Sequence, residues 1–146
     1  MILIDSDVFS ALMAEEPVDV VVQWLERHDR TIIGTTSISI FEVRFGIQRR
    51  PPGRRRFKLE RGFERVMREI VQDRIVGLDA AAAVRAAELA ATRELDGINV
   101  GTGDTLIAGI VIAHGATLAT RNVRHFADLA IDVVNPWGPD DPGPDA

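Results

Sequence analysis

The alternation of short apolar segments with longer amphipathic segments is the feature that most constrains how this chain folds. We predict that the short apolar runs are buried strands, which cover residues 2–4, 31–34, 75–76, 118–119 and 131–134. We predict helices over residues 8–14, from Pro17 onward, over 38–48, after Pro51-Pro52-Gly53, over 80–95 and over 103–113. Strands that alternate with helices pair in parallel. The sequence therefore predicts an α/β fold of three layers, in which helices flank a parallel sheet on both faces.

The length and the C-terminal composition indicate one domain with a short tail. A chain of 146 residues has the size of a single ordinary domain. From Pro136 onward the sequence reads PWGPDDPGPDA, with four prolines, three aspartates and little to bury after Trp137. We therefore predict a domain over residues 1–135 and a tail over 136–146 that is disordered after Trp137.

The absence of cysteine limits the available chemistry. Without cysteine there is no disulfide, no thiolate nucleophile and no cysteine-based zinc site. A metal ion must be held by oxygen ligands or by the three histidines, which favours magnesium or manganese. No apolar run approaches the roughly 20 residues that span a bilayer, and the opening MILI reaches Asp5 without the basic and apolar regions of a signal peptide. We expect a cytoplasmic protein.

Polar residues stand at the ends of several predicted strands. Asp5 and Asn122 each directly follow a strand, Glu42 lies near the start of a helix, and Asp104 opens another helix. The carboxyl ends of parallel strands share one edge of a sheet, so we expect these four side chains to converge. Clustered carboxylates repel one another and call for a divalent cation. Such an ion suits the hydrolysis of a phosphodiester bond.

Each of these residues also has a purely structural interpretation. Asp5 can cap the following helix, and Ser39 with Glu42 fits the S-x-x-E capping box. Asp104 suits the first turn of a helix, and Asn122 is a good turn residue. The shared edge favours the site, because four independent caps need not face one point.

The three histidines have no spacing typical of metal ligands. His28 and His114 lie near predicted helix C-termini, where capping of the last carbonyls is the stronger interpretation. The sequence assigns no role to His125.

Five ordered motifs resemble those of PIN-domain ribonucleases, specifically of VapC-type toxins from type II (VapBC) toxin-antitoxin pairs. They are MILIDSDV at 1–8, SISIFEVRFG at 37–46, GDTLIA at 103–108, LATRN at 118–122 and NPW at 135–137. The resemblance implies a three-layer PIN-like fold and an endoribonuclease that depends on Mg²⁺, with Mn²⁺ as a substitute. It also implies a VapB-type antitoxin as partner and a homodimer.

The resemblance assigns a role to each residue of the quartet. Asp5 and Asp104 correspond to direct metal ligands, and Glu42 to a ligand that acts through water or orients the attacking water. Asn122 stands where many relatives have a fourth acid, and we expect it to hold water in the site. Asp7 stands where the family often has asparagine, and its carboxylate is a candidate to restore the missing charge. Ser6 and Thr120 are lesser candidates for hydrogen bonds to phosphate or water.

A basic stretch over residues 49–68 contains nine of the seventeen cations of a chain whose net charge is −5. In one interpretation its arginines, represented by Arg54, Arg55 and Arg56, anchor RNA phosphates. In the other they are the solvated face of a helix whose apolar stripe is buried. The resemblance adds dimer formation and antitoxin binding as roles of this region.

Two rival functions follow from the same residues. Asp5 and Asp7 also fit the D-x-D opening of a haloacid-dehalogenase-type phosphohydrolase, in which Asp5 is the nucleophile. Such enzymes normally use a lysine after a later strand, whereas the only lysine here is Lys58, inside the basic stretch. The non-enzymatic rival is a catalytically weak PIN domain that binds RNA or protein.

Overall fold

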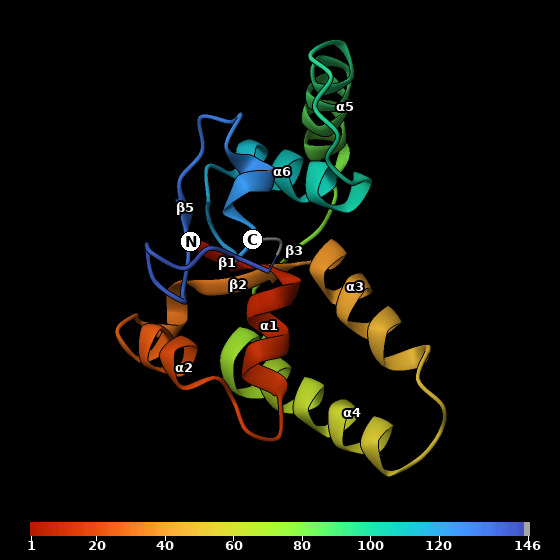
Figure 1. Cartoon of the computed structure of the whole chain (residues 1–146), viewed down its shortest axis with the longest axis vertical. Helices are drawn as coiled ribbons and strands as arrows, with labels where there is room; N and C mark the ends of the chain where they lie inside the picture. The colour runs from red at the N-terminus through yellow and green to blue at the C-terminus, as the bar shows by residue number, and fades with distance from the viewer. Residues whose placement is uncertain (145–146) are drawn as a thin grey trace.

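The computed structural model describes residues 1–144 and has a five-stranded sheet at its centre (Figure 1). The strands are β1 (Ile2–Ile4), β2 (Ile33–Thr36), β3 (Ile75–Val76), β4 (Thr117–Ala119) and β5 (Val133–Val134). Their order is β3-β2-β1-β4-β5 and every pair is parallel, as the sequence predicts. Ile4 pairs with Thr35 on one side and with Ala119 on the other, so β1, β2 and β4 end at the same edge.

Within residues 1–144, six α-helices connect and cover the strands. They are α1 (Ser6–Met13), α2 (Asp19–Glu26), α3 (Ser37–Gln48), α4 (Arg54–Val66), α5 (Ala80–Leu95) and α6 (Thr102–His114). Shorter turns are the 3₁₀ helices η1 (Arg30–Ile32) and η3 (Val123–Phe126) and the π-helical turn η2 (Met67–Val71). The second strand begins two residues later than predicted. The side chain of Asp29 accepts a hydrogen bond from the Thr31 amide and so closes η1 over the predicted start of that strand.

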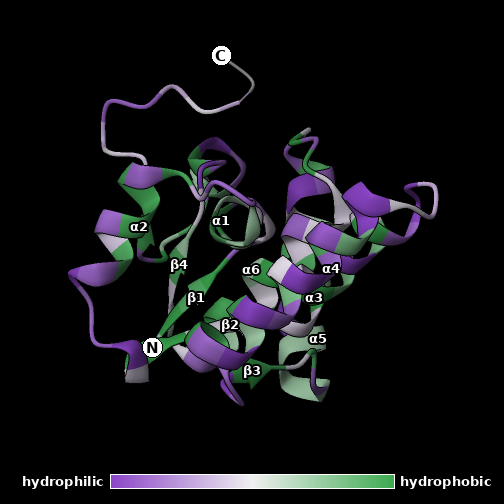
Figure 2. Cartoon of the chain, turned by 90° about the horizontal axis from the view of Figure 1, so that it is seen from below, coloured by the Kyte–Doolittle hydropathy of each residue, from purple (hydrophilic) through white to green (hydrophobic). Residues whose placement is uncertain are grey.

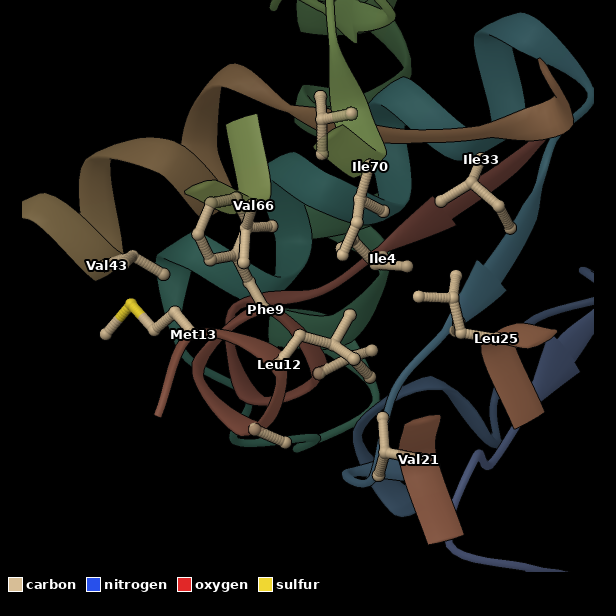
Figure 3. Close-up of a cluster of buried hydrophobic side chains, with 14 of the residues drawn as sticks. Ile4, Phe9, Leu12, Met13, Val21, Leu25, Ile33, Val43, Val66 and Ile70 are labelled. Carbon is tan, nitrogen blue, oxygen red and sulfur yellow. The ribbon is translucent and has the colours of Figure 1, made fainter. Parts of the chain in front are cut away.

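The two faces of the sheet carry separate cores, as expected for three layers. Side chains of Ile4, Ile33 and Ala119 pack with the layer that contains α1, α2 and α4 (Figure 3). Leu3 and Leu118 point to the opposite face and pack with α5 and α6. Figure 2 shows hydrophobic residues along β1 and hydrophilic residues over much of α3 and α4. No helix within residues 1–144 has the length and apolar character needed to cross a membrane.

Two glycines allow helices to approach closely on opposite sides of the sheet. A Cβ atom added to Gly62 of α4 would lie 2.0 Å from the carbonyl oxygen of Met13, at the end of α1. A Cβ added to Gly109 of α6 would lie 2.6 Å from both the carbonyl oxygen of Ala82 and the Cβ of Ala86, on α5. Both contacts are with atoms that cannot rotate away, so these helix pairs require glycine.

The segment after β5 returns toward the loop that follows β4. The Arg121 guanidinium donates two hydrogen bonds of 3.0 Å to the Asp141 carboxylate and lies over the Trp137 ring at 4.9 Å. The Arg121 partnership lowers the pKa of Asp141 to about 2. Sequence reasoning gave no sign of these contacts, and the disorder expected after Trp137 stays a prediction.

Candidate metal and nuclease site

Asp5 follows β1 directly and is only 2% exposed. Its Oδ1 accepts a hydrogen bond of 2.7 Å from the Ser6 amide, and its Oδ2 accepts one of 2.8 Å from the Thr120 hydroxyl. Burial, and then the negative charges of Asp7 and Asp104, raise the pKa of Asp5 to about 7. The capping interpretation of Asp5 is therefore confirmed, and the same carboxylate also lies among acidic neighbours.

Asp7 joins the first turn of α1 to the segment that follows β4. Its Oδ1 accepts a hydrogen bond from the Val8 amide at 2.7 Å, and its Oδ2 accepts one from the Arg121 amide at 2.8 Å. Burial raises the pKa of Asp7, and these hydrogen bonds oppose that effect. Its charge lies close enough to act on both Asp5 and Glu42.

Glu42 is not part of a capping box, so that structural interpretation is wrong. The residue that caps α3 is Thr36, whose side-chain oxygen accepts a hydrogen bond of 3.0 Å from the Ser39 amide. Ser39 therefore lies inside the helix and cannot be the N-cap residue of a capping box with Glu42. The helix starts before Ser39 because Thr36, the last residue of β2, has the extended backbone angles of an N-cap. Its hydroxyl oxygen accepts the hydrogen bond of a first-turn amide.

The Glu42 carboxylate instead points toward the N-terminal turn of α6. An added Cβ on Gly103 would lie 3.5 Å from its Oε1, so the side chain rests against that glycine. Oε1 is buried and has no hydrogen-bond partner among the described residues. Burial, Asp104 and Asp7 raise the pKa of Glu42. A buried acceptor with no donor beside other carboxylates is a position that a cation or its bound water would satisfy.

Asp104 lies in the first turn of α6 and pairs with His125. Its Oδ2 is 2.6 Å from Nδ1 of His125, in η3. The two side chains are 18% and 35% exposed. Sequence reasoning left His125 without a role, because the contact joins residues that are 21 positions apart.

Asn122 lies at the same edge of the sheet, where its main-chain amide makes polar contacts. Its amide donates a hydrogen bond of 3.1 Å to the Thr120 hydroxyl oxygen and also lowers the pKa of Asp7. Thr120 is fully buried and links this segment to Asp5. The role proposed for the Asn122 side chain, holding water, stays a prediction.

The residues at this edge fit a hydrated divalent cation. Within residues 1–144 no group of three or more His, Asp or Glu side chains is placed closely enough to hold a metal ion by itself. Mg²⁺ does not need three protein ligands, since it usually keeps several waters and binds through one or two carboxylates. That mode of binding is matched by three features: the donors are all oxygens, the acids repel one another, and the Oε1 of Glu42 has no hydrogen-bond partner among the residues that the structure describes.

A groove of about 770 Å³ leads away from these acids along α3. Its lining includes Ser6, Asp7 and Glu42, and it continues to Arg49 and Arg50. Arg49 follows Glu42 by seven positions and caps α3, which places it about 10 Å farther along the helix axis.

The arginines singled out in the sequence do not line this groove. Arg54 and Arg55 lie exposed at the start of α4. Arg56 donates to the side chains of Gln48 and Glu60. Their role in RNA binding stays a prediction, whereas Arg49 and Arg50 are the cations that the groove contains.

The remaining candidates lie away from the acids. His28 Nδ1 is 2.8 Å from the carbonyl oxygen of Trp24, which confirms its capping role at the end of α2. His114 ends α6, with Nε2 3.6 Å from Asp79. Lys58 pairs with Glu15 at 2.9 Å, so the only lysine of the chain is not beside Asp5 as a phosphohydrolase would require.

The acidic cluster predicts an inverted pH dependence of stability in the metal-free protein. The pKa of Asp5 is raised from 3.8 to about 7, so between these pH values the folded state binds a proton that the unfolded state has released. Stability then falls as pH rises, by about 1 kcal/mol per pH unit for one such group. Urea denaturation in EDTA at pH 5, 6, 7 and 8 measures this slope. Stability that rises across the window would contradict the electrostatics described.

Comparison with known proteins identifies the family to which this chain belongs. The PIN domain family matches residues 2–132. The plasmid stability protein StbB of Pseudomonas syringae pv. tomato is 32% identical over 137 residues, which are 94% of this chain and 99% of the relative. The VapC ribonuclease Y4jK of Sinorhizobium fredii is 31% identical over 139 residues, which are 95% of this chain and 99% of the relative. The solved FitAcB structure from Neisseria gonorrhoeae has a TM-score of 0.80 at 28% identity, over 94% of this chain and 99% of that chain.

The chain therefore belongs to the PIN domain family. Within that family it groups with the VapC-type toxins, which confirms the resemblance carried by the five sequence motifs.

Proposed function

We propose that this chain is a Mg²⁺-dependent endoribonuclease, with Mn²⁺ as a substitute, that hydrolyses RNA phosphodiester bonds as the toxin of a toxin-antitoxin pair. The observation that carries the proposal is the buried Oε1 of Glu42, which lies beside Asp104 and Asp7 and has no hydrogen-bond partner within residues 1–144. Carboxylates that raise one another's pKa values destabilise the folded protein unless a cation binds among them. Such clusters are typical of functional sites. The similarity to a protein named VapC ribonuclease supports RNA as the substrate.

Each side chain of the site has a separate role in this proposal. Asp5 and Asp104 would hold a divalent ion, and the Thr120 hydroxyl fixes the Oδ2 of Asp5 by a hydrogen bond. Glu42 orients the attacking water, and Asn122 holds a further water by hydrogen bonding. The divalent ion, when bound, acidifies water and neutralises charge on the phosphate.

The test is cleavage of a mixed RNA pool by the purified chain, with Mg²⁺, with Mn²⁺ and with EDTA. We expect fragments only with a divalent ion, and none from an Asp5→Asn protein purified identically as the control for contaminating ribonuclease. Cleavage that is equal in both proteins, or that persists in EDTA, would refute the proposal. Metal binding without turnover of any RNA would favour the alternative of a binding module.

The groove predicts which arginines contact RNA. Replacing both Arg49 and Arg50 with alanine should raise KM for RNA about tenfold with little change in kcat, because two phosphate contacts are lost. The slope of log K against log salt should fall by about 1.4, at roughly 0.7 per contact with single-stranded nucleic acid. The matched control removes two charges from the same stretch at Arg54 and Arg55, which lie outside the groove. A larger effect in the control would restore the sequence-based assignment to Arg54, Arg55 and Arg56.

We extend the proposal to partners and place of action. The relative named toxin FitB, 27% identical, and the solved FitAcB and FitAB structures support a VapB-type antitoxin as partner. We also propose a homodimer, action in the cytoplasm, where the RNA substrate is found, and a nuclease domain over residues 1–135. Size-exclusion chromatography with light scattering tests the dimer.

A further inference from the structure

The pair formed by Asp104 and His125 is held in place by a third, buried residue. Arg93, near the end of α5, is 3% exposed although it carries a full charge. Its Nη2 donates a hydrogen bond of 2.8 Å to the carbonyl oxygen of His125. Its Nη1 donates one of 2.9 Å to the hydroxyl of Thr105, the residue next to Asp104.

The same guanidinium also binds the segment that follows η3. Nε and Nη2 of Arg93 each donate a hydrogen bond of 2.9 Å to the Asp128 carboxylate. One arginine thus joins α5 to the first turn of α6 and to η3, on both sides of the contact between Asp104 and His125. A buried ion pair adds little net stability compared with apolar packing, and such pairs are sometimes retained because they fix one geometry.

The contact of His125 occupies one oxygen of Asp104. Nδ1 must carry the proton to donate to Oδ2 of a carboxylate at 2.6 Å, and the ring then holds the carboxylate in one orientation. Among the described residues no hydrogen bond to Oδ1 of Asp104 is present, so this oxygen is available to a cation. A carboxylate with one oxygen fixed and the other available is better organised for binding than one that rotates.

We propose that His125, anchored by Arg93, is a positioning residue that orients Asp104 for divalent-cation binding. This inference rests on the proposed metal-dependent function. His125 does not touch the ion or the RNA in this role, and it acts through Asp104. Partners that orient a metal ligand typically contribute 10-fold to 100-fold in metal affinity or activity.

The test compares three histidine variants of the full chain. His125→Ala removes the donor, and His125→Asn keeps an N–H close to the position of Nδ1. His114→Ala is the matched control, because His114 lies at the opposite end of α6. Mn²⁺ affinity is measured by isothermal titration calorimetry, RNA cleavage gives kcat and KM, and circular dichroism confirms the fold.

We expect His125→Ala to weaken Mn²⁺ binding by tenfold or more and to lower kcat with KM for RNA unchanged. His125→Asn should recover most of the affinity, and His114→Ala should match the wild type. Arg93→Lys, which cannot span the same partners with one ammonium group, should also weaken Mn²⁺ binding.

Two different results distinguish a failure of the positioning role from a failure of the proposed metal-dependent function. Wild-type Mn²⁺ affinity in a folded His125→Ala protein would overturn the positioning role and leave the proposed function standing. Failure of the wild type itself to bind Mn²⁺ would overturn both. Equal losses in His125→Ala and His125→Asn would show that the imidazole is needed for something other than its Nδ1 donor, and would also overturn the inference as stated.

Discussion

Replacing Asp5 with asparagine is expected to lower metal-dependent RNA cleavage by about a thousandfold and, at the same time, to stabilise the metal-free protein. The loss of activity reflects about 4 kcal/mol of transition-state stabilisation that a divalent ion supplies and that a missing ligand forfeits. The gain in stability arises because Asp5 is 2% exposed and lies near the charges of Asp7 and Asp104. An amide of the same shape removes the buried charge and retains an acceptor for the Ser6 amide.

The two effects are measured separately. Cleavage is followed with Mg²⁺ at pH 7.5, and the free energy of unfolding is measured by urea denaturation in EDTA at pH 8, where we expect a gain of at least about 1 kcal/mol. The pH dependence of stability between pH 5 and 7 should also become flatter. Asp73→Asn serves as the control, since Asp73 is exposed and outside the cluster. Retained cleavage in Asp5→Asn, or a loss of stability, would remove Asp5 from the role assigned to it.

Replacing Gly62 with alanine is expected to give the largest loss of stability of any single methyl addition to α4. The new Cβ would lie 2.0 Å from the carbonyl oxygen of Met13, so α1 and α4 must move apart. Overpacking of this kind costs about 1–3 kcal/mol, and more where the contact is with backbone. The contact also fixes the end of α1, the helix that begins beside Asp5.

A second glycine provides the matched control for this substitution. Gly46 lies within α3, and an added Cβ there meets no atom within 4 Å. Gly46→Ala should therefore stabilise the protein by about 0.5–1 kcal/mol, because alanine loses less backbone entropy in a helix. Urea midpoints at constant m-value give both numbers. Equal stability of the two variants would show that α1 and α4 are not in the close contact described.

The order and type of the main elements could be predicted from the sequence because they depend on local spacing. The helix predicted over 80–95 has the same bounds as α5. Its start is well defined because the Asp79 side chain caps it by accepting a hydrogen bond from the Ala82 amide. The apolar run over 31–34 predicts a strand two residues too early, because Asp29 closes a 3₁₀ turn that apolar content alone does not reveal. The S-x-x-E pattern likewise offers Ser39 as a cap, whereas Thr36 caps α3 and the helix begins one residue before the predicted 38–48.

The members of the acidic cluster could be proposed from the sequence, but their surroundings could not. Parallel topology brings Asp5 and Asp104 to one edge, as the alternation of elements implies. The partner of Asp104 is His125, which shares no motif spacing with it. One faint signal was present for Arg93. It falls on the same buried face of α5 as Ala82 and Ala86, where a charged residue must have a partner.

The sequence by itself determined the strand and helix order, the parallel sheet and the family, since these follow from periodicity, caps and motifs that are each read within a few residues. Only the tertiary structure decided which side chains pair across the edge of the sheet. It showed that one Glu42 oxygen has no hydrogen-bond partner in the described part of the chain, that Arg49 and not Arg54 lines the groove, and that Arg93 joins the segments of Asp104 and His125. These contacts depend on helix placement over ångström distances, and the packing of the whole chain fixes that placement.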